Sequence, residues 1–252
     1  MVRVILHGCN GKMGSVVTEM IAKEPEMEIV AGVDPYLGVA REYPVYPVIF
    51  DCAEEADVII DFASAKAVDA LLDYTAERKI PAVICTTGLT KGQDEMIGAI
   101  SKEVAILRSA NMSLGINLLM KLLQEAAATL YEAGFDIEIV EKHHNQKVDA
   151  PSGTAIALAD AVQAGLSEEM EYVYDRSQVR KKRDRKEIGF ASVRGGTITG
   201  DHDVIFAGTD EVVTFSHQAY SKAVFAKGAV AAAKFLAGKP AGLYRMSDVV
   251  GV

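Results

Sequence analysis

The densest group of chemically active side chains lies between residues 141 and 154, where the sequence reads Glu-Lys-His-His-Asn-Gln-Lys-Val-Asp-Ala-Pro-Ser-Gly-Thr. His143, His144 and Lys147 provide hydrogen-bond donors and side chains that titrate near neutral pH. A strand is predicted to end in this run and a helix to begin in it. The run therefore predicts acid and base chemistry, carried by His143 and Lys147, at a strand-to-helix junction.

The end of the same run predicts an anion site. Pro151-Ser152-Gly153-Thr154 is typical of a helix start, where the first backbone amides have no partner within the helix and suit a carboxylate. A single histidine more often makes a structural hydrogen bond, and a Ser or Thr cap is usually only a cap. Finding both so close together favours a site. Glu141 and Asp149 complete no recognisable metal-ligand pattern, so no metal is predicted.

A glycine-rich turn predicts a dinucleotide site. It lies between a strand at 2–6 and a helix at 15–23, where backbone amides can hold a pyrophosphate. Asn10 stands where the common motif has its middle glycine, but Asn tolerates a left-handed backbone, so a tight turn remains possible. Asp34 closes the next strand, where a carboxylate can accept hydrogen bonds from a ribose. The glycines of this turn are Gly8, Gly11 and Gly14.

In the part of the chain that carries the glycine turn, short apolar runs alternate with helices. This pattern predicts an α/β fold with a Rossmann-type parallel sheet. Two polar segments, Thr86-Thr87-Gly88 and Ser109-Ala110-Asn111-Met112, each follow a predicted strand. Ligands usually lie at that edge of a parallel sheet, so we expect contacts with ribose and nicotinamide. Strands are predicted at 2–6, 29–33, 58–62, 82–85 and 104–107, and helices at 15–23, 65–78 and 91–102.

The pattern changes after residue 114 and predicts a second domain of α+β type. A long apolar helix ends around Tyr131, and the later segments alternate in the manner of antiparallel strands of an open, mixed, largely antiparallel sheet. We expect a dinucleotide-binding domain at 1–114, completed by 221–252, and a second domain at 115–220. The strands of the second domain are predicted at 135–140, 191–199, 203–206 and 211–216.

Composition limits the partners. A net charge of −9 argues against nucleic acid, and the basic run at 180–186 is interpreted as a solvated loop, with local attraction of an anionic ligand as the alternative. Three cysteines without paired spacing predict neither a disulfide framework nor a zinc site. There is no charged leader and no apolar run of membrane-spanning length, so we expect a cytoplasmic protein without a membrane partner.

Four other polar positions are left outside the predicted site. His7, His202 and His217 are isolated in the sequence, which favours a structural hydrogen bond for each. Arg194 begins an Arg-Gly-Gly segment that is either near the substrate pocket or a bulge in a strand.

Taken together, these motifs resemble the dihydrodipicolinate reductase family of lysine and diaminopimelate biosynthesis. The most specific element is His143-His144-x-x-Lys147-x-Asp149-Ala150-Pro151-Ser152-Gly153-Thr154, and the glycine turn, Thr86-Thr87-Gly88 and Ser109-Ala110-Asn111 occur in the family's order. The resemblance implies a Rossmann domain and NAD(P)H as the cofactor. It also implies that the mixed-sheet domain at 115–220 is a substrate-binding and oligomerisation domain, which forms a homotetramer. It implies hydride transfer to a small cyclic dicarboxylate after loss of the 4-hydroxyl group as water, which yields tetrahydrodipicolinate.

The resemblance also implies a role for each site residue. His143 and Lys147 are the acid and base, while His144, Gly153 and Thr154 hold a substrate carboxylate. The cofactor is expected to contact Gly8, Cys9, Asn10, Gly11, Lys12, Met13, Asp34, Cys85, Thr86, Thr87, Ser109, Ala110, Asn111 and Met112.

The chain departs from the family pattern at three positions. Cys85 stands where many members have Gly, Lys222 where Arg is usual, and Pro35 where some members carry an arginine for the 2′-phosphate of NADP. Asp34 beside a 2′-phosphate would be repulsive, and Lys12 is the nearest cation in the sequence. We therefore expect NADH to be modestly preferred and NADPH to be usable.

Two other classes of function remain open from the residues. One is a semialdehyde dehydrogenase in which Cys85, at a strand end, acts as a thiolate nucleophile. The other is a non-catalytic dinucleotide sensor with an oligomerising sheet, against which the histidine and lysine run argues.

Overall fold

The computed structural model describes residues 1–251, and these form two compact units. The first comprises Met1–Leu114 together with Ala223–Gly251, and the second comprises Gly115–Lys222. A parallel sheet in the first unit and a mixed sheet in the second confirm the predicted α/β class. Within residues 1–251, no helix is both long and apolar enough to span a membrane.

The first unit is built on a sheet of seven parallel strands in the order β12-β6-β5-β4-β1-β2-β3. Its central strands are continuous apolar runs, as expected for strands buried on both faces. The strand order reverses at β1, so the carboxyl end of β1 lies at the switch point where ligands of such sheets bind. The strands are β1 (Val2–His7), β2 (Met27–Val33), β3 (Val45–Tyr46), β4 (Val58–Asp61), β5 (Ala82–Ile84), β6 (Ala105–Arg108) and β12 (Gly242–Tyr244).

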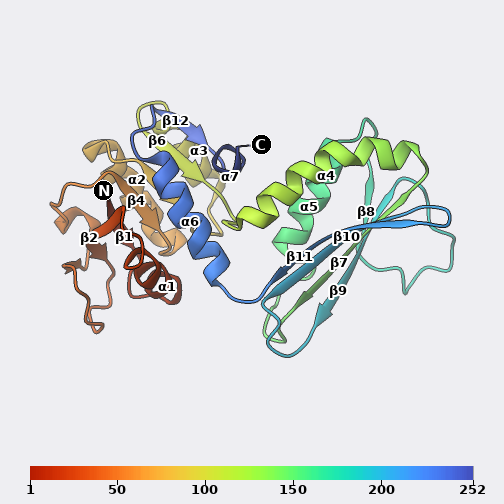
Figure 1. The fold of residues 1–252 in the computed structure, drawn as a ribbon, viewed down its shortest axis with the longest axis horizontal. Coiled ribbons are helices and arrows are strands. Elements are labelled where there is room, and N and C mark those ends of the chain that lie inside the picture. Colours follow the sequence, from red (N-terminus) through yellow and green to blue (C-terminus); the bar gives the residue numbers. More distant parts are fainter. Residues whose placement is uncertain (252) are drawn as a thin grey trace. The chain divides into compact units, whose positions relative to one another are not determined.

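Helices cover both faces of this sheet (Figure 1). Side chains of α1 (Lys12–Ile21) and α6 (Ala223–Leu236) pack in one apolar cluster with Val4, Leu6 and other strand residues. Side chains of α2 (Val68–Arg78) and α3 (Lys91–Ile100) pack on the opposite face. Burying both faces fixes the strand ends that carry the polar segments. The remaining elements of this unit are η1 (Ile49–Asp51), η2 (Ala65–Ala67) and α7 (Met246–Val250).

The second unit contains a mixed sheet in the order β11-β10-β7-β9-β8. β10 runs antiparallel to both β7 and β11, whereas β9 runs parallel to β7 and β8 parallel to β9. The prediction that the segment from 191 forms an antiparallel strand was therefore wrong in direction, because β9 begins at Glu187 after a long connection. The strands are β7 (Asp136–His143), β8 (Glu171–Val173), β9 (Glu187–Arg194), β10 (Gly200–Ala207) and β11 (Val212–Ala219).

One face of this mixed sheet is covered by α4 (Leu114–Glu132) and α5 (Gly153–Ala164). Along β7, buried residues alternate with half-buried ones, and Ile137 and Ile139 join the apolar core. The same alternation places Glu141 and His143 on the covered face of β7, at its carboxyl end. A buried carboxylate and imidazole thus follow two apolar side chains on one face.

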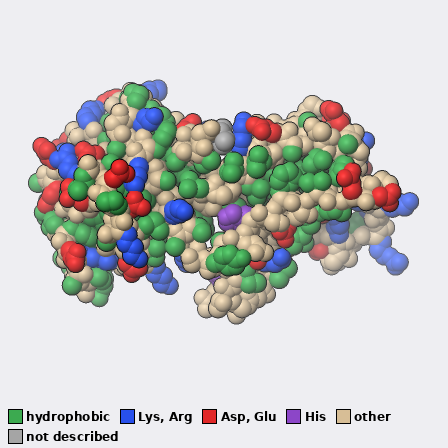
Figure 2. Space-filling view, viewed as in Figure 1, with side chains coloured by type: hydrophobic (Ala, Val, Ile, Leu, Met, Phe, Trp, Pro, Cys, Tyr) green, Lys and Arg blue, Asp and Glu red, His purple; other side chains and the backbone are tan. Residues whose placement is uncertain are grey.

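Charged side chains of both signs are interspersed over the face of the first unit seen in Figure 2. In the second unit, hydrophobic side chains gather over α4, where Leu118 and Leu122 are exposed. The surface of the first unit in this view therefore presents no patch of a single sign.

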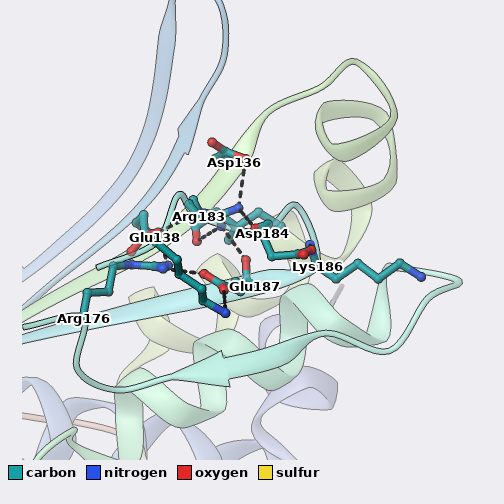
Figure 3. Close-up of polar contacts among 9 residues, drawn as sticks. Asp136, Glu138, Arg176, Arg183, Asp184, Lys186 and Glu187 are labelled. Atoms are coloured by element: carbon teal, nitrogen blue, oxygen red, sulfur yellow. Dashed lines mark hydrogen bonds and ion pairs between the residues drawn. The ribbon is translucent and has the colours of Figure 1, made fainter. Parts of the chain in front are cut away.

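The basic run at 180–186 is not simply a solvated loop. Arg183 donates to Asp136 Oδ1 and to Glu138 Oε1 at 2.9 Å each, and also to the carbonyl oxygens of Ile137 and Glu187 (Figure 3). The bonds reach backbone at the start of both β7 and β9. The interpretation as a solvated segment was wrong for Arg183. Asp136 and Glu138 of β7 bind its guanidinium, and they are too distant in the sequence for this contact to be predicted.

Candidate active site

The turn after β1 depends on glycine at two positions. Gly8 has a φ of +80°, and a Cβ atom there would stand 2.8 Å from backbone atoms of Phe62 and Ala63. A Cβ atom on Gly14 would stand 2.2 Å from the carbonyl oxygen of Gly8. Glycine is therefore required at both positions for the backbone of the turn to lie against the start of α1.

The first turn of α1 presents uncapped backbone amides. Gly11 is the N-cap and makes no side-chain capping bond, and both Gly11 and Lys12 are exposed. The amides of Lys12 and Met13 have no partner within the helix, and the helix dipole favours an anion beside them. A tight glycine turn packed against the start of α1, followed by uncapped amides, fits the pyrophosphate of a dinucleotide cofactor.

Asp34 lies against the glycine turn. Its Oδ2 accepts from the backbone amide of Asn10 at 3.0 Å and its Oδ1 from that of Tyr36 at 2.9 Å. Each carboxylate oxygen retains a lone pair for a ribose hydroxyl. Asn10 needs no left-handed backbone, because within residues 1–251 only Lys79 and Asp210 combine a side chain with positive φ. Gly8 makes the turn, and the argument from the tolerance of Asn was unnecessary.

A guanidinium that the sequence analysis missed lies beside the same turn. Arg41 Nε donates to Asn10 Oδ1 at 2.9 Å, and its Nη2 donates to the Cys9 carbonyl oxygen at 2.6 Å and to Ser15 Oγ at 2.9 Å. All three acceptors are uncharged, so Arg41 brings a positive charge to the turn. It lies in an irregular segment between β2 and β3, where no motif spacing points to it.

The two other polar segments of the first unit follow neighbouring strands, β5 and β6. Thr86 is buried and Thr87 is exposed. Ser109 Oγ donates to the carbonyl oxygen of Asn111 at 2.8 Å, which closes a tight turn in which Ala110 is exposed. Both segments are at the carboxyl edge of the parallel sheet, as is the glycine turn.

Cys85 is unsuited to nucleophilic catalysis. Its side chain is 6 % exposed, and burial, reinforced by the negative charge of Asp61, raises the pKa of the thiol well above its ordinary value. A nucleophilic cysteine needs a thiolate. The semialdehyde dehydrogenase alternative is therefore not supported.

In the second unit, the end of β7 holds a buried carboxylate against a histidine. Glu141 is fully buried, and its Oε2 lies 2.6 Å from His143 Nδ1. Burial would raise the pKa of Glu141, but hydrogen bonds from Arg194, Ser192 and His143 lower it to about 2. An ionised carboxylate has no hydrogen to donate, so Nδ1 carries the proton in this bond. Nε2 is then the atom of His143 that takes up and releases a proton.

The surroundings of His143 keep its ring largely buried. A Cβ atom on Gly200 would stand 3.0 Å from His143 Nε2, so glycine at this position of β10 makes room for this nitrogen. Burial lowers the pKa of His143, while the hydrogen bond to Glu141 opposes that shift. The group is thus able to change charge near or below neutral pH.

Arg194, which the sequence analysis left out, belongs to this cluster. Its Nη1 donates to Glu141 Oε2 at 2.8 Å and its Nη2 to Glu141 Oε1 at 2.7 Å. The amide of Gly195 donates to the carbonyl oxygen of His143 at 2.9 Å. The parallel pairing of β7 with β9 puts His143 and Arg194 in register, and the sequence alone gave no reason to expect that pairing.

His202 makes the structural hydrogen bond predicted for it, and it also contacts His143 of this cluster, which its isolated place in the sequence did not indicate. Its ring packs edge to face on that of His143, with centroids 5.1 Å apart, and its Nε2 lies 2.9 Å from Ser152 Oγ. Burial, followed by the charge of His143, lowers the pKa of His202 to about 4. Ser152 caps α5 through a 3.1 Å hydrogen bond from the amide of Ala155. The same Ser152 hydroxyl therefore contacts both the first turn of α5 and His202.

The remaining predicted residues lie between β7 and α5. Lys147 Nζ lies 2.8 Å from Asp149 Oδ1, an ion pair that lowers the pKa of Asp149. His144 is half-buried, Gly153 is exposed and Thr154 is half-buried in the first turn of α5. Within the described part of the chain, no group of three or more His, Cys, Asp or Glu side chains is arranged to hold a metal ion.

Family models cover nearly the whole chain. The model described as "Dihydrodipicolinate reductase, N-terminus" matches residues 2–112, and the one described as "Dihydrodipicolinate reductase, C-terminus" matches residues 115–250. The chain belongs to the dihydrodipicolinate reductase family.

Relatives in this family resemble the chain over its full length. The 4-hydroxy-tetrahydrodipicolinate reductase of Caldanaerobacter subterraneus is 54 % identical over 250 residues, covering 99 % of this chain and 98 % of that protein. The corresponding reductase of Clostridium tetani is 48 % identical, covering 98 % and 96 %. A dipicolinate-bound dihydrodipicolinate reductase from Paenisporosarcina sp. TG-14 superposes with a TM-score of 0.80 at 25 % identity, covering 97 % of each chain. The resemblance predicted from the motifs is confirmed.

Proposed function

We propose that this chain catalyses the NAD(P)H-dependent reduction of the dehydrated form of 4-hydroxy-tetrahydrodipicolinate to tetrahydrodipicolinate in lysine and diaminopimelate biosynthesis. The observation that carries the proposal is the family membership of both units, joined to the buried Glu141 and His143 pair beside the start of α5. The chain is an NAD(P)H-dependent oxidoreductase of this family. A dipicolinate-bound relative supports a small dicarboxylate as the substrate.

The cofactor would be held by the carboxyl edge of the parallel sheet. The amides of Lys12 and Met13 would bind the pyrophosphate, Asp34 the adenosine ribose, and the segments after β5 and β6 the ribose and nicotinamide. Bound NAD(P)H supplies a hydride to the substrate ring and becomes NAD(P)⁺. Cys9 and Cys85 contribute backbone, since burial raises the pKa of both thiols.

Proton transfer would fall to His143. Reduction adds a hydride and a proton to the ring, and Nε2 of a protonated His143 donates that proton. Glu141 holds the opposite nitrogen and stabilises the charged ring. Lys147 would leave its ion pair with Asp149 and bind a substrate carboxylate instead, or it would assist proton transfer as the second acid and base group.

Substrate carboxylate binding would use His144 and the first turn of α5. The amides of Gly153 and Thr154 lie at a helix N-terminus, which favours an anion, and Gly153 is exposed. Lys222, in place of the usual arginine, would contact carboxylate as a point charge without a bidentate fit.

NADH would be modestly preferred, with NADPH still usable. Asp34 favours two free ribose hydroxyls and opposes a 2′-phosphate. Arg41 is bonded to the turn and Lys12 follows it as an exposed cation, so either would offset part of that repulsion.

The protein would act in the cytoplasm as a homotetramer. α4 and α5 cover only one face of the mixed sheet, and exposed apolar side chains, Val193 and Val212, lie on its strands β9 and β11. An uncovered sheet face of this kind is suited to self-association. Light scattering coupled to size exclusion tests this: a mass four times that of the 27.0 kDa chain is expected, and a monomer would contradict it.

A coupled assay tests the proposed reaction. Pyruvate, aspartate semialdehyde and the preceding synthase generate the substrate, and the decrease in nicotinamide absorbance is followed after this protein is added. Oxidation that requires both the synthase product and this chain is expected. Binding of NADH without any oxidation would instead support the non-catalytic sensor.

A further inference from the structure

Arg194 stands out as a charged residue that the proposed reaction does not use. Its side chain is 20 % exposed and makes two parallel hydrogen bonds to the fully buried Glu141. Its Nη2 also donates to the carbonyl oxygen of Asp149 at 2.7 Å. A bidentate pair of this kind fixes the plane of the carboxylate as well as its charge.

The same carboxylate is the partner of the histidine. Glu141 accepts from His143 Nδ1 at 2.6 Å and from the amide of Ser152 at 3.2 Å. Its two oxygens therefore join β7, β9 and the start of α5 at one buried point. Any tilt of the carboxylate moves the imidazole with it, because the bond to Nδ1 is short.

We propose that Arg194 is a positioning residue that acts through Glu141: the guanidinium clamps the carboxylate, and the carboxylate fixes the ring and tautomer of His143 so that Nε2 faces the substrate. This inference rests on the proposed function, in which His143 donates the proton. Arg194 touches no reacting atom in this account. Its effect on turnover passes entirely through the carboxylate.

Electrostatics gives the two partners opposite effects on the histidine. The carboxylate of Glu141 favours the charged ring, whereas the guanidinium of Arg194 disfavours it. The other groups near His143 are present in all the variants considered below. These are Lys147, Asp149, which is paired with Lys147, and His202, which is neutral near pH 7 because its pKa is lowered to about 4.

The test compares pH profiles of kcat for Arg194→Ala and Glu141→Gln. Because a protonated His143 is needed, kcat falls as the pH rises through the pKa of the ring, which burial holds below its ordinary value of 6.5. Loss of Arg194 raises the pKa of His143 and moves this fall to higher pH, and loss of the Glu141 charge moves it to lower pH. Both variants should lose roughly 10²-fold in kcat, the effect expected of a partner that orients a catalytic group.

Arg194→Lys separates positioning from charge. Lysine restores the positive charge but not the two-pronged contact. The fall in kcat with rising pH should return to its wild-type position, while kcat itself recovers only in part. Full recovery of kcat would mean that charge alone matters and would overturn the positioning role.

Arg183→Ala is the matched control. Arg183 also binds carboxylates of β7 and reaches β9 (Figure 3). These contacts are at the opposite end of β7 from His143. Its removal should lower the melting temperature without moving the pH profile. If Arg194→Ala behaves like Arg183→Ala, with normal kcat and an unmoved profile, the inference is wrong.

The proposed function fails differently. If the wild type shows no turnover, the proposed function itself is wrong. If the wild type turns over and His143→Gln is inactive while Arg194→Ala and Glu141→Gln keep wild-type profiles, only the positioning inference fails. A folded Arg194→Ala, judged by circular dichroism, with a displaced profile supports it.

Discussion

At the scale of single residues, two ion pairs determine what the site can do. Glu141 is held ionised at the end of β7 by Arg194, and Lys147 is held by Asp149 on the following loop. The first pair is buried, so it orients His143 strongly; the second is half exposed and is easily exchanged. A fixed imidazole beside an exchangeable ammonium suits a site in which one group donates a proton and the other receives a carboxylate.

Lys147→Ala tests the exchangeable pair. Loss of the ammonium should raise KM for the dicarboxylate and lower kcat, since a neutral side chain neither pairs with a carboxylate nor assists a proton. Asp149→Asn is the control: it frees Lys147 and should leave kcat within about threefold of wild type, because a surface ion pair contributes little. Steady-state kinetics with near-native kcat/KM in Lys147→Ala would reduce this lysine to a surface charge.

The two cations at the glycine turn give a second prediction at this scale. Lys12→Ala and Arg41→Ala should each lower kcat/KM for NADPH more than for NADH, because only NADPH carries the 2′-phosphate beside Asp34. Arg41→Ala should have the larger effect, since Arg41 is held beside the turn by three hydrogen bonds. A strong preference of the wild type for NADPH would refute the argument from Asp34.

At the scale of elements, the sequence predicted those parts of the site that lie on one continuous segment. The glycine turn, the polar segments after β5 and β6, and the run from His143 to Thr154 each lie at the junction expected from periodicity. Arg41 and Arg194 were missed, and the contact of His202 with His143 was not expected, because strand pairing or an irregular loop brings these residues to their partners. Short strands such as β3 and β8 were missed because a run of two or three residues is too short to show the alternation of apolar and polar side chains that predicts a strand.

Gly228 on α6 tests how closely a helix supports a cofactor segment. A Cβ atom there would stand 1.6 Å from the carbonyl oxygen of Met112, so Gly228→Ala must displace either α6 or the Ser109 to Met112 segment. We expect a loss of stability of roughly 1–3 kcal/mol and a higher KM for NADH.

Gly98→Ala on α3 is the matched control. A Cβ atom at that position meets no atom within 4 Å, so alanine should stabilise the helix by about 0.5–1 kcal/mol and leave KM unchanged. Urea unfolding of both variants checks the pair, and equal stability of the two would contradict the close contact.

At the scale of the whole molecule, the buried histidines make stability depend on pH. Burial lowers the pKa of His202 from 6.5 to about 4, so the unfolded chain binds this proton more readily than the folded one. Stability attributable to His202 is therefore complete above about pH 6.5 and is lost as the pH falls toward 4, by roughly 3 kcal/mol at most. The pKa of Glu141, lowered to about 2, adds a loss only below about pH 4.5.

His202→Gln should flatten this dependence. The free energy of unfolding, measured in urea between pH 7 and 4, should decrease less steeply in the variant than in the wild type, because one buried group no longer resists protonation. His143 and His217, whose pKa values are also lowered, keep the slope from vanishing. Parallel curves for the two proteins would mean that His202 does not contribute.

The central claim is that this chain transfers hydride from a nicotinamide to a cyclic dicarboxylate. The most direct test uses NADH with deuterium at both C4 positions, the synthase product as the substrate, and mass spectrometry of the ring product. The account predicts tetrahydrodipicolinate that carries a single deuterium on carbon, formed by the wild type and much more slowly by His143→Gln. Product without deuterium, or no reduced product, would contradict the account.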